Sequence, residues 1–131
     1  MFIQKIEADI PVLYKEVPTF PLGIKDAFDE LYSHFAGRHF YGISHMDDAG
    51  NVIYKAAAAG SAVEAAQYGY NAFTIPAGDW LAEKVTDWMS KIDSFKDIFG
   101  QLMQDARYDP TVDCVEWYID DVEMLIMVKC R

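Results

Sequence analysis

The chain has 131 residues, of which 52% are hydrophobic and 24% are charged, and its formal net charge is −10. This length and balance are typical of one globular domain, residues 1–131, with a core of its own, and they exclude a disordered chain. The 11 basic residues are scattered singly, so the sequence lacks the clustered Lys and Arg that nucleic-acid phosphates require. The excess of carboxylates favours cationic ligands or basic partner surfaces instead.

The first half is expected to contain a strand, a helix and a hairpin, in that order. Residues 8–17, A-D-I-P-V-L-Y-K-E-V, have the pattern of a strand, and two prolines follow them. Apolar residues then recur at three- and four-residue steps over 22–35, which predicts an amphipathic helix that stops near Gly37. Residues 39–46 and 51–58 flank the turn sequence D-D-A-G, which predicts a hairpin.

The second half repeats this order. Residues 73–85 contain strand material that a proline and a glycine interrupt. A helix is predicted over 93–106, because its apolar residues again share one face. Residues 112–119 and 122–129 form a second predicted hairpin, and its turn is acidic like that of the first.

The two halves also share a short sequence motif. The heptapeptide K-D-A-F-D-E-L at 25–31 recurs as K-D-I-F-G-Q-L at 96–102, each time before a hairpin with an Asp-Asp turn. We therefore expect a duplicated strand-helix-strand-strand module, with pseudo-repeats at about 8–58 and 72–129. The predicted fold class is α+β, an antiparallel sheet with two helices on one side and a central groove between the modules.

One charge interrupts the last predicted hairpin, in the sequence C-V-E-W-Y. Since alternate residues of a strand share a face, Cys114, Glu116 and Tyr118 are expected to point the same way. Val115 and Trp117 point the other way, and because they are apolar we expect them to contact the helices. Glu116 would then face away from the helices.

The partner strand, residues 122–129, is apolar on both faces. Only one face can take the helices, so the apolar surface on the other predicts a pocket or an interface. In a pocket, Glu116 would either be a general acid or base with a raised pKa or anchor a bound cation with the help of aromatic rings. The alternative is a solvated Glu116 at the edge of the sheet.

Other side chains could line the same groove as Glu116 and Tyr118, although core packing explains each of them as well. These candidates for ligand contact are Tyr41, Tyr54, Trp80 and Met124. The histidines have no metal-ligand spacing and are expected on the surface or in turns: His34, His39 and His45.

The sequence contains no P-loop, no G-x-G-x-x-G, no G-x-S-x-G and no H-E-x-x-H, so we expect no cofactor and no metal. Cys114 and Cys130 form no C-x-x-C pair and are expected to be buried, reduced thiols. The N-terminal residues lack the pattern of a signal peptide, and no run of 18 apolar residues could span a membrane. These features predict a cytoplasmic protein.

Five motifs carry a resemblance to a known family, in that family's order, over about Leu22 to Lys129. They are F-D-E-L-Y, F-Y-G-I-S-H, T-I-P-A-G-D-W, I-F-G-Q-L-M and C-V-E-W-Y-I-D-D-V-E-M-L. Together they resemble the GyrI-like small-molecule-binding domains, which belong to the same superfamily as the effector-binding domains of AraC- and MerR-type transcription activators.

The resemblance implies a duplicated module with a central groove and a Glu on the last hairpin, in an apolar and aromatic pocket. In multidrug-sensing members this Glu meets cationic aromatic compounds, and here it corresponds to Glu116. Some stand-alone members resemble hydrolases of cyclopropane-bearing DNA alkylators; in such an enzyme Glu116 would be the acid or base, with Tyr118 or Tyr41 positioning the electrophile. The type member binds DNA gyrase and antagonises its poisons.

The leading expectation is a stand-alone protein that binds amphipathic or cationic aromatic molecules, with a role in drug or toxin resistance or sensing. The alternatives are a hydrolase of electrophilic xenobiotics that uses the same Glu and a protein-interaction module of the gyrase-inhibitor kind. Because the chain has no helix-turn-helix segment and is acidic, we do not expect it to contact DNA directly.

Overall fold

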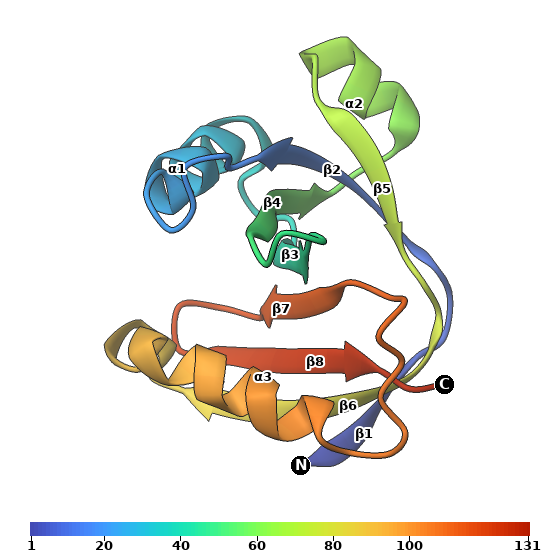
Figure 1. The fold of residues 1–131 in the computed structure, drawn as a ribbon. Coiled ribbons are helices and arrows are strands. Elements are labelled where there is room, and N and C mark those ends of the chain that lie inside the picture. Colours follow the sequence, from blue (N-terminus) through green and yellow to red (C-terminus); the bar gives the residue numbers. More distant parts are fainter.

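The computed structural model describes all residues 1–131 and consists of an eight-stranded antiparallel sheet with helices packed on it (Figure 1). The strands are β1 (Phe2–Ile6), β2 (Ile10–Glu16), β3 (Phe40–Met46), β4 (Val52–Ala59), β5 (Asn71–Ile75), β6 (Gly78–Thr86), β7 (Cys114–Tyr118) and β8 (Glu123–Lys129). The α-helices are α1 (Ile24–Phe35), α2 (Ala62–Tyr68) and α3 (Phe95–Met103). Two single 3₁₀ turns, η1 (Trp88–Ser90) and η2 (Ile92–Ser94), precede α3.

The strand order is β1-β6-β8-β7-β3-β4-β2-β5. The order strand-helix-strand-strand occurs twice, as β2-α1-β3-β4 and as β6-α3-β7-β8, and the two units meet where β3 pairs with β7. Each unit also receives an edge strand from the other half of the chain, because β1 pairs with β6 and β5 pairs with β2. The predicted α+β fold with its antiparallel sheet is confirmed.

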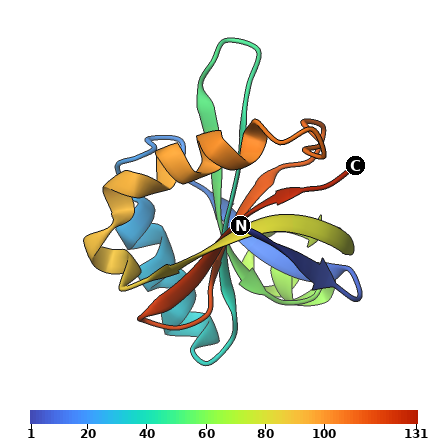
Figure 2. The same ribbon diagram turned by 90° about the horizontal axis from the view of Figure 1, so that it is seen from below.

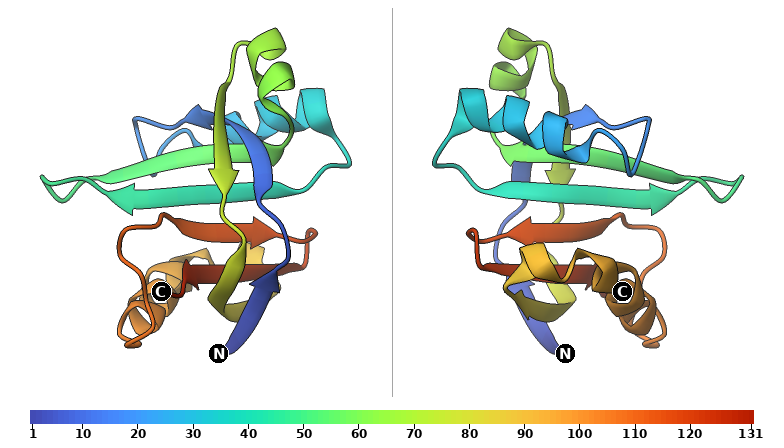
Figure 3. Two further views of the ribbon diagram at one scale, coloured as in Figure 1. Left: turned by 90° about the vertical axis from the view of Figure 1, so that its right-hand side faces the viewer. Right: turned by 90° about the vertical axis from the view of Figure 1, so that its left-hand side faces the viewer.

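The sheet is curled, so that both faces of its central strands are covered. Figure 3 shows β1–β2 and β5–β6 running across one face of β4, β3, β7 and β8, while α1 and α3 lie on the other face. The third helix, α2, packs against β2 and β5, and its Ala65 shares a core with Leu31 of α1. The β3–β4 hairpin extends beyond the rest of the molecule (Figure 2).

The expectation about the two faces of β7 is wrong in one respect. The alternation holds, but Val115 and Trp117 face the crossing strands, where they pack with residues such as Ile6, Ile75 and Leu125. The helices lie on the side of Glu116 instead. The physical reason is that both faces of the β7–β8 hairpin are apolar, and the crossing strands cover the face that a single helix layer would have left open.

The predicted elements are present with shifted bounds, and two were missed. Gly37 follows α1 with a φ of +87°, in the left-handed region that favours glycine. The predicted helix over 93–106 is shorter and begins with 3₁₀ turns. Strand β1 was not predicted, and neither was α2, although Ser61 and Glu64 form a capping box at its start.

Cys114 and Cys130 are free and buried, as expected, and the three histidines are exposed. None of the helices is both long and apolar enough to cross a bilayer. No three His, Cys, Asp or Glu side chains are grouped so that they could hold a metal ion.

Candidate functional site

The centre of the sheet lies between two helices. Helix α1 packs on β4 and α3 packs on β8, so the paired strands β3 and β7 run between them. We call the helix-facing side chains of this strand pair the central strip. It consists of Phe40, Gly42 and Ser44 from β3 and of Cys114, Glu116 and Tyr118 from β7.

Glu116 is the only acidic residue of the central strip, and two tyrosines hold its carboxylate. The hydroxyl of Tyr54 donates to Oε1 at 2.8 Å, and the hydroxyl of Tyr118 donates to the same oxygen at 2.7 Å. Tyr118 lies two residues further along β7, whereas the buried Tyr54 comes from β4. Strand pairing across β3 thus brings together groups that lie 62 residues apart in sequence.

Gly42 makes room for this arrangement. It is the direct strand partner of Glu116, in the middle of the β3–β7 pairing. A Cβ atom at position 42 would overlap Oε1 of Glu116 and the hydroxyl of Tyr54, closer than real Cβ atoms come. The two tyrosine hydrogen bonds therefore depend on a glycine at this place in the strand.

Burial sets the electrostatics of the group. Loss of solvent raises the pKa of Glu116 above its ordinary value, and the hydrogen bonds from Tyr118 and Tyr54 partly oppose this by stabilising the charged form. The pKa of each tyrosine is raised in turn, first by burial and then by the neighbouring Glu116. Both tyrosines consequently stay protonated and act as donors.

The second carboxylate oxygen of Glu116 is available. Oε1 accepts both tyrosine hydrogen bonds and Oε2 accepts none. No fully buried side-chain oxygen or nitrogen in the protein lacks a hydrogen-bond partner, so Oε2 must keep some contact with solvent. A ligand could therefore reach Oε2 without breaking an existing bond.

Aromatic rings surround the carboxylate. Phe28 of α1 lies edge-on to Tyr118 with ring centroids 5.6 Å apart, and Trp88 of η1 does so at 4.9 Å. Phe20, from the loop before α1, stacks on Tyr54 at 5.1 Å. The rings of Phe20, Phe28 and Trp88 thus pack on the two tyrosines that hold the carboxylate, and they are themselves partly exposed to solvent.

Only some of the predicted site residues lie near the Glu116 carboxylate. Glu116, Tyr118 and Tyr54 are in direct contact, and the fully buried Met124 of β8 is the strand partner of Tyr118. Tyr41 and Trp80, in contrast, are buried on the opposite face of the sheet, in the core beneath the crossing strands. Of the two alternatives for these residues, the structure shows core packing and not groove lining, because Tyr41 pairs with Trp117 rather than with Glu116 and Trp80 belongs to the same core cluster.

Sequence reasoning also missed four residues of the site. Phe20 lies between two prolines and was treated as part of a chain break, and Phe28 was counted only as helix core. Trp88 follows the end of a strand without a recognisable pattern. Gly42 carried a usable signal, since a glycine inside a strand often marks the close approach of another group.

Two open depressions lie elsewhere, with volumes of about 260 Å³ and 460 Å³. Both adjoin Lys15, Glu16 and Glu30, and Glu116 lines neither of them. In these depressions Glu30 is already neutralised by Lys15 at 2.9 Å and accepts a hydrogen bond from Tyr70 at 2.6 Å. We regard Glu116 as the stronger candidate, because its carboxylate is partly buried, has no cationic partner and keeps one free oxygen.

No protein family matches the sequence, and no curated relative does. An integron cassette protein from the mobile metagenome of Vibrio cholerae has a similar structure, with a TM-score of 0.71 and 13% identity over 99% of this chain and 95% of that chain. SAV2435, solved with bound tetraphenylphosphonium, has a TM-score of 0.63 and 13% identity over 98% of this chain and 93% of that chain. At such identities the likeness shows that the fold is shared.

Proposed function

We propose that this protein binds lipophilic aromatic cations between α1 and α3, with Glu116 as the anionic anchor. The observation that carries the proposal is a partly buried carboxylate that has no cationic partner, keeps one free oxygen and is held by tyrosines on which further rings pack. A bound cation would neutralise Glu116 and so remove the free-energy cost of a buried charge. The rings of Trp88 and Tyr118 would add cation–π attraction.

The rings of Phe20 and Phe28 pack on the two tyrosines that hold Glu116, so a ligand that comes between α1 and α3 must displace some of these ring contacts. Phe20 and Phe28 are suited to this, because they make no hydrogen bonds and are partly exposed. A change of rotamer at either residue would open the central strip without moving the backbone. The ligand would then replace protein–protein ring contacts with its own, which favours planar or multi-ring cations over small ions.

The shared fold adds support from outside the chain. SAV2435 was solved with tetraphenylphosphonium, a lipophilic cation whose four phenyl rings shield its charge. Such an ion offers no hydrogen-bond donor, so its recognition depends on charge and ring contacts, the two features that surround Glu116. On this proposal the chain is a binding module for drug-like or toxic cations, with a role in sensing or resistance.

The test is a titration of the protein with tetraphenylphosphonium, followed by tryptophan fluorescence, because Trp88 lies beside the proposed site. Glu116→Gln preserves the shape of the side chain and removes its charge, and it is expected to weaken binding at least tenfold. Triphenylphosphine oxide is a neutral compound with similar rings, and it should bind equally to both proteins. Equal affinity of wild type and variant for the cation would refute the anchor role.

A matched control keeps the charge and changes the rings. Phe28→Leu is expected to weaken binding of the cation and of the neutral compound alike, since it removes a ring contact and no charge. Glu7→Gln, at an exposed position remote from the site, should leave both affinities unchanged.

The raised pKa of Glu116 also supports a second candidate, a hydrolase of electrophilic xenobiotics. Because its pKa is raised, the Glu116 carboxylate is a stronger base than an exposed one and can take a proton from water at Oε2, while Tyr118 and Tyr54 hold Oε1 in place. Such general-base assistance contributes about 10²–10⁴-fold to a rate. If this candidate is right, Glu116→Gln abolishes turnover of a cyclopropane-bearing alkylator while the protein still binds it; absence of any turnover by wild type would exclude it.

A further inference from the structure

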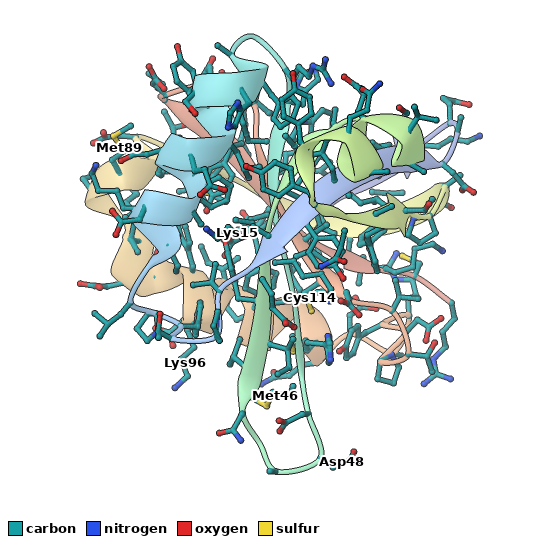
Figure 4. The ribbon with its side chains drawn as sticks, turned by 90° about the horizontal axis from the view of Figure 1, so that it is seen from above. Lys15, Met46, Asp48, Met89, Lys96 and Cys114 are labelled. Atoms are coloured by element: carbon teal, nitrogen blue, oxygen red, sulfur yellow. The ribbon has the colours of Figure 1, made fainter.

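A group of exposed apolar side chains lies at one end of the molecule, on two neighbouring segments. They are Met89 (56% exposed), Ile92 (55%), Ile119 (40%) and Val122 (53%). The first two belong to the segment 86–94, from the last residue of β6 to the start of α3, and the other two to the turn 119–123, from the end of β7 to the first residue of β8. We call this surface the η1 patch. Figure 4 shows Met89 at the outer edge of the molecule, well away from Asp48 in the β3–β4 turn.

Trp88 holds the two segments together. Its backbone N–H donates to the carbonyl of Val122 at 3.3 Å, and its indole N–H donates to the carbonyl of Asp120 at 2.9 Å. Its ring packs against Tyr118 on the inner side. The exposed apolar side chains therefore lie on a backbone that is already ordered. Binding of a partner would cost little further backbone conformational entropy.

The η1 patch is acidic as well as apolar. Residues 86–94 and 119–123 together carry five carboxylates and one lysine, Lys91, and one of the five, Glu123, is paired with Lys84 of β6 at 2.6 Å. That lysine donates to the carbonyl of Thr86 at 2.7 Å and so lies along its own segment. Asp93 and Asp121 are exposed and make no hydrogen bond or ion pair within the protein. Exposed apolar groups rimmed by charges of one sign are typical of interaction surfaces.

We propose that the η1 patch docks a basic amphipathic segment of another protein. Its apolar face would cover Met89, Ile92 and Val122, and its lysines or arginines would meet the surrounding carboxylates. The negative charge of the η1 patch disfavours two other binding partners. An anionic membrane would be repelled, and a second copy of this chain brings the same acidic patch and a net charge of −10.

The test uses the isotope-labelled protein and a synthetic helical peptide of about 18 residues, with leucines on one face and lysines on the other. Amide chemical-shift changes are expected to concentrate in residues 86–94 and 119–123 and to saturate. Ile92→Lys should lower the affinity for the peptide at least tenfold, and raising the salt concentration should also lower the affinity. Binding that maps to these segments and falls in this variant supports the proposal.

Matched controls separate docking from general attraction to an acidic protein. Val63→Lys makes the same change at another exposed apolar residue, on α2, and should leave the affinity within about twofold, a difference under 0.5 kcal/mol. A peptide with glutamates in place of the lysines should not bind. Glu116→Gln should bind the lysine peptide like wild type, so that failure here is distinguishable from failure of the proposed ligand site.

Three outcomes would overturn the proposal. The first is shift changes spread over other acidic segments, such as the β3–β4 turn, and the second is equal loss of binding in Ile92→Lys and Val63→Lys. The third is concentration-dependent shifts of the η1 patch without peptide, which would make a second copy its occupant.

Discussion

Gly42 faces Glu116 across the central strand pair, and the glycine leaves the space that the glutamate carboxylate and the Tyr54 hydroxyl occupy. A side chain of any size at position 42 would separate these groups. The strand therefore gives up the packing that a β-branched residue would provide and in return holds a buried carboxylate. Such an exchange of packing for a buried charge is typical of functional sites rather than of cores.

The first prediction follows from this contact. Gly42→Ala should destabilise the fold by about 2 kcal/mol, as overpacking in a tight core does. It should also weaken tetraphenylphosphonium binding, because it pushes Glu116 and Tyr54 apart. Chemical denaturation and the fluorescence titration measure the two effects.

The control for this substitution lies in the second half of the chain. Gly100, within α3, has nothing near the place where a Cβ would sit. Gly100→Ala should therefore raise the free energy of unfolding by about 0.5–1 kcal/mol, since alanine favours a helix over glycine. A Gly42→Ala variant that is as stable as wild type or more so, as expected of Gly100→Ala, would contradict the account of the site.

The second prediction concerns pH and stability. Since the pKa of Glu116 is raised in the folded protein, its protonated form stabilises the fold below the ordinary value of 4.5, and this contribution is lost as pH rises through the folded pKa. Glu116→Gln should therefore be more stable than wild type at pH 8 and closer to it at pH 4. Thermal melts across this range measure the difference.

An exposed glutamate provides the comparison. Glu7→Gln changes the same formal charge at an exposed position, so the difference in melting temperature from wild type should be small at every pH. If both variants show the same pH dependence relative to wild type, the carboxyl of Glu116 does not have a raised pKa.

The third prediction concerns ligand affinity and pH. A cation binds the carboxylate form, so the affinity for tetraphenylphosphonium should increase as pH rises through the raised pKa of Glu116 and then level off. Tyr118→Phe removes one of the two hydrogen bonds that stabilise the carboxylate. The pKa should rise further, and the whole binding profile should move to higher pH.

Tyr32→Phe is the matched control for that substitution. Tyr32 is exposed on α1, and its hydroxyl makes no hydrogen bond to the carboxylate. Its binding profile should coincide with that of wild type. A profile that does not move in Tyr118→Phe would show that this hydroxyl does not influence the charge on Glu116.

The fourth prediction concerns α2, which sequence reasoning missed. The hydroxyl of Ser61 accepts the backbone N–H of Glu64 at 3.2 Å, and Glu64 also forms a two-pronged ion pair with Arg38. Ser61→Ala should cost about 1 kcal/mol of stability through loss of the cap. Ser33→Ala on α1 is a suitable control, because Ser33 is exposed and bonds only within its own helix. Equal effects of the two substitutions in denaturation experiments would argue against the cap.

The sequence by itself determined the local geometry of the site. Period-two alternation in C-V-E-W-Y brings Cys114, Glu116 and Tyr118 to one face, and a strand leaves no other choice. The positions of α1, α3 and the two hairpins also follow from short-range patterns, because apolar spacing and turn residues act over a few residues. These features needed no knowledge of distant contacts.

Only the tertiary structure decided what surrounds that face. The β7–β8 hairpin is apolar on both sides, so its pattern cannot tell which side takes the helices and which the crossing strands. The choice depends on how β1 and β5 are exchanged between the two units, a long-range pairing with no local signature. Packing of the whole sheet brings Tyr54 and Gly42 to Glu116 and leaves Tyr41 and Trp80 on the far side, which is why the pairing of Glu116 with Tyr118 on one face could be predicted and most of the other neighbours could not.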